Sequence, residues 1–285
     1  MSIIRLNEEN AHFYEDYIGC DMCRELERKY FRGIVALDEH DERPSGGIIF
    51  ELHGLEEDGK DILSRIEWFR EDAPGFGKMV LDEYSRMMRE EGVSKSEFAI
   101  PVDKERPEKN LLKEAGFTAK LYEGDDIFVS MEQMVRMPIV KKKLDTSMVV
   151  PLEELTVRQF RKAVSKCIDM GRKGLLEDFE YLSMRWFDTH VSSCVIKDGE
   201  IAGLLLFRQS ASGMLSVKLI AGFGQGAQLN IAAMMKASIE RAAGIYPPDT
   251  QVVLRRHTDA TILLTEKLFP TTIGYPVYRG ERAEN

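Results

Sequence analysis

One carboxylate in this sequence stands where it could act as a catalytic base. Glu67 lies in the run Arg65-Ile-Glu-Trp-Phe69, with apolar side chains directly before and after it. A carboxylate in apolar surroundings costs free energy unless it is paired, and such positions are often functional. Glu67 could therefore take a proton from a nucleophile. The structural alternatives are an outward-facing strand residue, or an ion pair with Arg65 or Arg70.

Two glycine turns could bind an anion. Each precedes a helical pattern, and a helix N-terminus leaves backbone N–H groups unpaired and carries a partial positive charge. Glycines let a phosphate approach that backbone closely. The alternative is a tight strand-to-helix turn that needs glycine for its φ angles. The candidate residues are Gly75, Phe76, Gly77 and Lys78 in the first turn, and Gly224, Gln225, Gly226 and Ala227 in the second.

The two turns differ in charge. Glu71 and Asp72 come directly before the first turn, and Pro74 within it has no N–H group. Only Lys78 favours an anion there. The second turn contains neither an acid nor a proline. On electrostatic grounds the second turn is the better cradle for a phosphate.

The same order of elements is predicted in both halves of the chain. Each half reads as a helix, a two-stranded hairpin, a strand that runs into a glycine turn, a helix, a strand, a helix and a final strand. The segment 136–147 interrupts the periodic pattern with Pro138 and a lysine cluster. We therefore expect a duplicated unit, with an N-terminal domain over residues 1–135, a linker over 136–147 and a C-terminal domain over 148–285.

Length, composition and charge restrict the class of protein. The chain has 285 residues, which favours two domains, and a net charge of −9 without a basic stripe. This charge disfavours a nucleic-acid partner, which needs a basic surface. The sequence has no apolar run long enough to cross a membrane and no signal-peptide pattern, so we expect a cytoplasmic protein without a membrane partner. Cys20 and Cys23 have no second pair at zinc spacing, so no metal is expected. The oligomeric state stays open.

The order of elements and the glycine turns together resemble the GNAT N-acetyltransferase family. The stretches Gly75–Leu81 and Gly224–Leu229 resemble the family's Gly-x-Gly turn, and Ala115-Gly116-Phe117 resembles its late Leu-Gly-Phe. The resemblance implies an α+β fold of two tandem GNAT-like domains, each a mixed, mostly antiparallel sheet flanked by helices. It also implies that acyl-CoA enters a gap between the fourth and fifth strands, with its pyrophosphate on the glycine turn.

The resemblance further implies a function and roles for residues. The function would be acyl-CoA-dependent N-acyl transfer, with acetyl-CoA as donor and a small-molecule or protein amine as acceptor. Glu67 would be the base, and Phe69 and the residues of both turns would bind the CoA moiety. The family's usual acid is a tyrosine, which is replaced here by Leu112 in the first copy and by Leu264 or Thr265 in the second. Tyr122 is a possible substitute.

Two other functions stay open at this point. The missing tyrosines and the acidic first turn are compatible with a degenerate GNAT-like pair that binds or scaffolds without catalysis. An aminoacyl-tRNA-dependent transferase also pairs two such halves, although the net charge of −9 argues against a tRNA partner.

Overall fold

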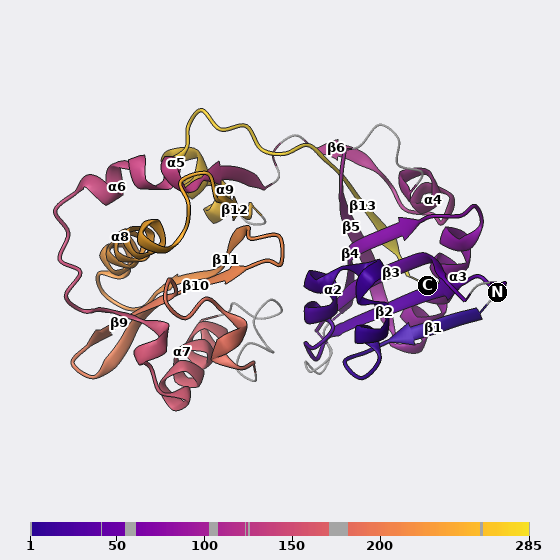
Figure 1. Cartoon of the computed structure of the whole chain (residues 1–285), viewed down its shortest axis with the longest axis horizontal. Coiled ribbons are helices and arrows are strands. Elements are labelled where there is room, and N and C mark those ends of the chain that lie inside the picture. The colour runs from indigo at the N-terminus through magenta and orange to yellow at the C-terminus, as the bar shows by residue number, and fades with distance from the viewer. Residues whose placement is uncertain are drawn as a thin grey trace. The chain divides into compact units, whose positions relative to one another are not determined.

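The computed structural model describes residues 2–40, 42–54, 61–102, 108–122, 124, 126–170, 182–256 and 259–284. The chain forms two compact units, each with its own β-sheet (Figure 1). The first unit comprises Met1–Glu123 and Pro276–Asn285, and the second comprises Gly124–Tyr275. Each unit is a mixed sheet flanked by helices, so the expected α+β architecture is confirmed.

The first unit is built on a seven-stranded sheet with the order β1-β2-β3-β4-β5-β13-β6. Its strands are β1 (Ser2–Leu6), β2 (Phe31–Leu37), β3 (Pro44–His53), β4 (Ile62–Glu71), β5 (Val93–Pro101), β6 (Lys120–Tyr122) and β13 (Val277–Ala283). Its helices are η1 (Ala11–Tyr14), α1 (Glu15–Ile18), α2 (Cys20–Glu25), α3 (Phe76–Glu90) and α4 (Glu108–Glu114). Among these strands β4 and β5 run parallel, and the other neighbours are antiparallel.

The second unit is built on a six-stranded sheet with the order β7-β12-β11-β10-β9-β8. Its strands are β7 (Ile127–Ser130), β8 (Val149–Pro151), β9 (Ser193–Lys197), β10 (Glu200–Gln209), β11 (Leu215–Gly222) and β12 (Gln251–Leu254). Its helices are α5 (Met131–Arg136), α6 (Pro138–Lys141), η2 (Leu152–Glu154), α7 (Val157–Asp169), η3 (Met184–Trp186), α8 (Ala227–Ile245) and α9 (Asp259–Leu268). Its parallel pair is β11 and β12.

The two units exchange their final strands, so their boundaries differ from the expected ones. Strand β7, expected to close the first domain, pairs with β12 in the second sheet. Strand β13, expected to close the second domain, lies between β5 and β6 in the first sheet. The expected linker over 136–147 contains α6, and the preceding α5 packs in the second unit. Hydrophobic periodicity marks β7 and β13 as strands, but it does not specify which sheet each one joins.

Close packing holds β13 in the first sheet. A Cβ atom on Gly280 would lie 1.7 Å from the carbonyl oxygen of Thr118, so no larger residue fits there. Arg282 donates to the Ala115 carbonyl at 2.8 Å and to Ser85 Oγ at 3.1 Å, which ties the strand to α4 and α3. The last strand of the chain is therefore an integral part of the first unit.

Helices cover both faces of each sheet with apolar side chains. In the first unit α3 and α4 cover one face, whereas η1, α1 and α2 cover the other. In the second unit α5 and α8 cover one face and α7 covers the other. The run Leu204-Leu-Leu-Phe207 of β10 is buried on both faces, as expected of a central strand. These layers fix the strands that carry the candidate sites.

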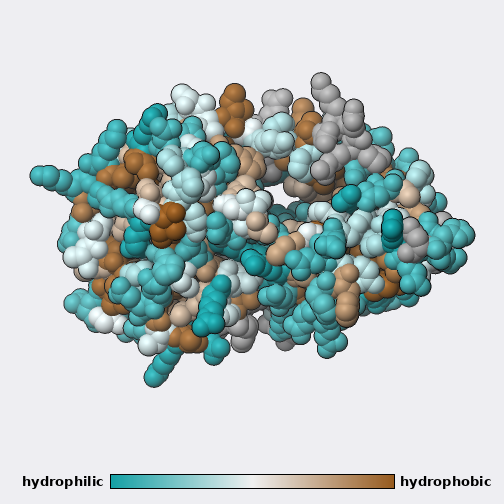
Figure 2. All heavy atoms as spheres, viewed as in Figure 1, coloured by the Kyte–Doolittle hydropathy of each residue, from teal (hydrophilic) through white to brown (hydrophobic). Residues whose placement is uncertain are grey.

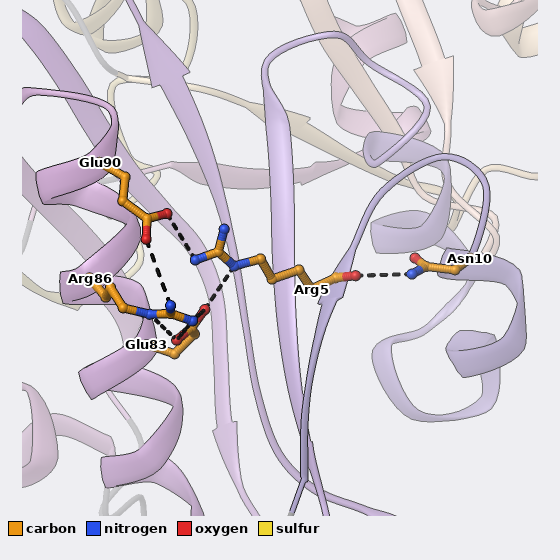
Figure 3. Close-up of polar contacts among 5 residues, drawn as sticks. All are labelled: Arg5, Asn10, Glu83, Arg86 and Glu90. Atoms are coloured by element: carbon orange, nitrogen blue, oxygen red, sulfur yellow. Dashed lines mark hydrogen bonds and ion pairs between the residues drawn. The ribbon is translucent and has the colours of Figure 1, made fainter.

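An ion-pair network attaches β1 to α3 (Figure 3). Nε of Arg5 donates to Glu83 at 2.7 Å, and Nη2 of Arg5 donates to Glu90 at 2.9 Å. Arg86 Nε also donates to Glu83, at 2.8 Å. Burial alone would raise the pKa of Glu83, but the hydrogen bonds from the two arginines outweigh it and lower that pKa below its usual value. The network holds the helix that follows the first glycine turn.

Hydrophilic side chains cover most of each unit on the face drawn in Figure 2, with apolar side chains scattered among them. Within the described ranges, no helix combines the length and the hydropathy needed to cross a membrane. The same ranges contain no cluster of three or more histidine, cysteine or acidic side chains that could hold a metal ion.

Candidate active site

Strand β4 separates from its parallel neighbour β5 in the middle of the first sheet. The two strands pair from Ile62 with Val93 to Ile66 with Phe98, and their pairing ends there. Beyond this point β4 continues along β3, whereas β5 continues along β13. The edge of β4 that faces the gap therefore carries backbone groups without a strand partner, which a ligand can hydrogen-bond.

Glu67 is the extra residue of a β-bulge at this point of separation. Ile66 pairs with Phe50 of β3, and Trp68 pairs with the adjacent Ile49. Glu67 lies between these two pairs without a partner of its own on β3. Bulges of this kind redirect side chains and are over-represented next to active sites.

The bulge changes which face of the sheet each β4 side chain occupies. Ile66 and Phe69 both lie in the apolar core with α3, although regular alternation would put them on opposite faces. Trp68 lies on the other face, where its ring meets that of Tyr17 edge-on with centroids 5.7 Å apart. Phe69, expected to bind the CoA moiety, thus directs its side chain into the core. The Glu67 side chain is half-buried.

The arginines on either side of Glu67 pair with other acids. Arg65 Nη2 lies 2.8 Å from Glu97 Oε1, and Arg70 Nε lies 2.8 Å from Asp72 Oδ1. In the described part of the chain, the Glu67 carboxylate has neither an ion pair nor a hydrogen bond. The ion-pair explanation of this residue is therefore not supported, and its role as a base remains a prediction.

The first glycine turn already holds an anion of its own. Gly75 caps α3 with a φ of 93°, in the left-handed region that favours glycine. The Oε1 atom of Glu71 accepts hydrogen bonds from the backbone N–H groups of Gly75 and Gly77, both at 3.0 Å. Phe76 is buried and Lys78 is exposed. The N–H groups that would meet a phosphate are thus paired with a carboxylate of the same turn.

The first glycine turn lies close to its neighbours. A Cβ atom on Gly77 would lie 2.7 Å from Leu111 Cδ1 and 3.0 Å from Glu71 Oε1. On the neighbouring strand, a Cβ atom on Gly46 would lie 2.9 Å from Phe76 Cβ. The first turn is therefore packed tightly against β3 and α4.

The second unit repeats both the separation and the bulge. Strands β11 and β12 pair through Leu215 with Val252 and Ser216 with Val253, and their pairing ends there. The bulge follows at once on β11, where Lys218 is the extra residue opposite β10.

Counting from the bulge aligns the two copies. Lys218 precedes the helix-capping Gly226 by the same number of residues as Glu67 precedes Gly75. Gly226 therefore corresponds to Gly75, whereas the sequence comparison matched Gly75 with Gly224. Two consequences follow for charge. A cation replaces the candidate base, and Gly222 replaces Glu71.

The second turn contains no internal anion. Gly226 caps α8 with a φ of 81° and without a side-chain hydrogen bond. Ala227 N donates weakly to the Gly224 carbonyl at 3.3 Å. Among the described residues, the N–H groups of Gly226, Gln228 and Leu229 have no recorded acceptor. A Cβ atom on Gly222 would lie 2.4 Å from the Ala227 carbonyl oxygen, so a side chain like that of Glu71 is sterically excluded there.

Two lysines lie close to the second turn. Lys197 Nζ is 3.9 Å from the position that a Cβ atom on Gly226 would occupy. Lys166 Nζ is 5.1 Å from the centroid of the Phe223 ring and donates to the Ile201 carbonyl at 2.9 Å. Both ammonium groups favour an anion at this helix N-terminus. Of the four candidate residues here, Gly224, Gln225 and Gly226 are exposed and Ala227 is half-buried.

The structure offers no tyrosine in place of the missing acid at the positions compared. Leu112 is fully buried in the core, and the Thr265 hydroxyl donates to the Thr261 carbonyl at 2.8 Å. Tyr122 lies on β6, which β13 separates from β5, so the substitute suggested by the sequence is not next to the gap.

Sequence reasoning missed Lys197. It directly precedes the Asp198-Gly199 turn, which joins β9 to β10 at the end of the sheet where β11 meets its glycine turn. The Asp198-Gly199 pair is a hairpin signal, and it could have placed the preceding Lys197 at this end of the sheet.

Comparison with known proteins identifies the fold. No protein-family model matches the sequence, and no curated protein matches it. A solved structure of a tandem GNAT protein from the clavulanic acid biosynthesis pathway matches 100% of this chain and 98% of its own, with a TM-score of 0.64 and 10% identity. A conserved protein from Enterococcus faecalis V583 matches 99% of this chain and 72% of its own, with a TM-score of 0.58 and 11% identity.

A third solved structure agrees with these two. A GCN5-related N-acetyltransferase from Anabaena variabilis ATCC 29413 matches 100% of this chain and 73% of its own, with a TM-score of 0.53 and 12% identity. At such low identities the likeness concerns the fold. The two splayed strand pairs, the two bulges and the whole-chain match together show that this chain has the tandem GNAT acetyltransferase fold.

Proposed function

We propose that the protein is an acyl-CoA-dependent N-acyltransferase, which transfers an acetyl group from acetyl-CoA to an amine of a small molecule or a protein. The observation that carries this proposal is the position of Glu67. Its carboxylate is half-buried, has no partner among the described residues, and stands on the bulge where β4 leaves β5. A carboxylate in this position is suited to accept a proton from a group bound in the gap.

The proposed reaction needs one base and no metal ion. Glu67 takes a proton from the ammonium form of the acceptor, directly or through a water molecule. The neutral nitrogen then attacks the thioester carbonyl, an N–C bond forms, and the C–S bond breaks with its electron pair on sulfur. The nitrogen releases its second proton to water, so that a neutral amide forms. Because an ordinary thiol has a pKa of about 8.5, the leaving thiolate can take its proton from water. A dedicated tyrosine is therefore not required.

The reaction requires a binding site for CoA and a base, and the charges favour these two in different units. The second turn favours the diphosphate of CoA, because the N–H groups of Gly226 and Gln228 have no acceptor among the described residues and Lys197 lies beside them. The candidate base lies in the first unit. Chemistry at Glu67 requires CoA in the first unit as well, with contacts from Lys78 and from the Gly77 N–H group after Glu71 has left that N–H group.

The test is release of free thiol from acetyl-CoA in the presence of a panel of amines. The wild-type chain should release thiol with at least one amine, and Glu67→Gln should lower the rate strongly. Glu97→Gln is the matched control, because Glu97 is a carboxylate on the adjacent β5 that pairs with Arg65. Equal rates for wild type and Glu67→Gln would remove Glu67 from the mechanism.

A second candidate function is a binding module that holds acyl-CoA without catalysis. Two observations favour it: Lys218 replaces the base in the second unit, and Glu71 occupies the first turn. This module would bind CoA in a calorimetric titration and release no thiol with any amine. We further propose a cytoplasmic protein without a nucleic-acid partner, in keeping with its net charge of −9.

A further inference from the structure

In the first unit, the Glu71 carboxylate occupies the helix N-terminus at which the fold would receive an anionic ligand. Glu71 is the last residue of β4, and its carboxylate returns to the start of α3. The same oxygen, Oε1, accepts from Gly75 N and Gly77 N at 3.0 Å each. Hydrogen bonds to an ionised carboxylate are about twice as strong as neutral ones, and the helix dipole adds to them.

The neighbouring acid does not share this arrangement. Asp72 pairs with Arg70 at 2.8 Å and is exposed. Among the described residues, the Asp72 carboxylate accepts no hydrogen bond from the turn. Glu71 and Asp72 thus provide two adjacent carboxylates, of which one occupies the helix N-terminus and the other does not.

The second unit shows the same turn without this carboxylate. Gly222 stands at the position of Glu71, and the Ala227 carbonyl leaves no space for a side chain there. The α8 N–H groups of Gly226 and Gln228 have no recorded acceptor in the described part of the chain. At this helix end the first unit therefore has a carboxylate bonded to the backbone N–H groups, and the second unit has none.

We infer that Glu71 determines how the two units share CoA, because its carboxylate competes with the CoA diphosphate for the N-terminus of α3. The second unit binds CoA first. The first unit binds CoA only when the Glu71 side chain rotates away from Gly75 and Gly77. This inference rests on the proposed function, since it takes CoA as the ligand of the fold.

The experiment measures binding of CoA itself by calorimetry, with the full chain and without any acceptor amine. The starting variant is Gly226→Asp, which puts a negative charge at the second turn and so isolates the first unit. In this background Glu71→Ala should tighten CoA binding about tenfold or more, because it removes a competitor held by two charge-assisted hydrogen bonds. Glu71→Gln, which keeps an acceptor oxygen without the charge, should give a smaller gain.

Asp72→Asn is the matched control, because it removes a charge next to the turn but leaves both N–H groups paired with Glu71. It should change CoA binding much less than Glu71→Ala does. Unchanged binding in both Glu71 variants would overturn the inference, and so would an equal gain in Asp72→Asn. If Glu71→Ala loses its fold by circular dichroism, Glu71→Gln decides the question. The titration reports on Glu71 even if the protein transfers no acyl group, so failure of the proposed function is a separate result.

Discussion

The two units use one backbone plan with different charges at the bulge and at the helix end. In both, the strand before the glycine turn leaves its parallel neighbour at a bulge, and a left-handed glycine caps the next helix. The first unit puts Glu67 on the bulge and Glu71 on the helix end. The second unit puts Lys218 on the bulge and leaves the helix end without an internal anion.

This difference shows that the fold requires particular glycines but does not require a particular charge at the bulge. A backbone contact prescribes glycine at position 222, since a Cβ atom on Gly222 would lie 2.4 Å from the Ala227 carbonyl oxygen. The charge on the bulge differs between the copies: the Glu67 carboxylate has no partner among the described residues, whereas Lys218 Nζ lies 5.7 Å from the centroid of the Trp186 ring. A duplicated fold can therefore keep its gap in both copies while the two copies diverge in which ligand each gap favours.

The largest expected effect comes from removing the exchanged strand. A chain that ends at Tyr275 lacks β13, which pairs with β5 from Val277 to Ala283 and also with β6. The first unit should then fail to fold, because two strands lose their partner and Phe98 and Phe117 lose part of their cover. The second unit should stay folded.

The two tryptophans allow each unit to be followed separately. Trp68 lies in the first unit and Trp186 in the second. In urea titrations of the truncated chain, the fluorescence transition of a Trp186→Phe variant should disappear, whereas that of a Trp68→Phe variant should persist. Two intact transitions would contradict the role assigned to β13.

The next largest effect is expected in the rate of acyl transfer when the two bulge residues are substituted. Glu67→Gln should lower the rate of acyl transfer by about 10²–10⁴-fold, the range typical of a lost general base. Lys218→Met keeps the length and the apolar stem of the lysine and should leave the rate within about twofold, because Lys218 has no role in the proposed proton transfer. Rates with saturating acetyl-CoA provide the measurement. A larger loss for Lys218→Met would move the chemistry to the second unit.

A smaller effect is expected in CoA binding when the two capping glycines are substituted. Gly226→Asp should weaken CoA binding by about tenfold or more, because it puts a charge at the N–H groups that the diphosphate uses. Gly75→Asp should change CoA binding little, because Glu71 already occupies the equivalent groups. Both glycines have positive φ and no heavy atom closer than 3.9 Å to an added Cβ, so the strain is matched. Calorimetric titration of both variants gives the ranking, and the reverse order would assign the tighter site to the first unit.

Much of the fold could be predicted from the sequence because its signals are local. The apolar positions of α3, the Asp198-Gly199 turn and the Thr156 capping box each specify a neighbourhood of a few residues. The repeat in element order then predicts the second copy. Strand exchange was not predictable in this way, because the partner of a strand depends on residues far away in the sequence. Gly280 of β13, for example, packs against Thr118 and Phe98.

In the candidate site, too, the residue types could be predicted from the sequence, whereas their arrangement could not. The sequence shows that Glu71 and Asp72 lie next to the first turn. Whether they block an anion there depends on which carboxylate reaches the N–H groups. The bulge at Glu67 depends on register with β3, which a single strand does not specify. The two-residue offset between the glycine turns likewise became visible only from the helix starts at Phe76 and Ala227.

The smallest expected effect concerns the helices that follow the two turns. Glu83 on α3 is buried and bonded by Arg5 and Arg86, whereas the equivalent position on α8 is the buried Met234. Glu83→Gln should lower the free energy of unfolding of the first unit by about 1–3 kcal/mol at neutral pH, since it weakens hydrogen bonds to a charged group. Urea unfolding of the Trp186→Phe chain measures this change.

The pH dependence of this change distinguishes an ion pair from simple packing. The pKa of Glu83 is lowered in the folded state, so its stabilisation is fully present above the ordinary glutamate pKa of about 4.3. It is lost as the pH falls from there through the lower folded-state pKa. The difference between wild type and Glu83→Gln should therefore shrink in this acid range. Met234→Leu in the second unit should cost less than about 1.5 kcal/mol at every pH, because neither side chain titrates. A Glu83→Gln effect that stays constant in acid would show that α3, like α8, is held by packing alone.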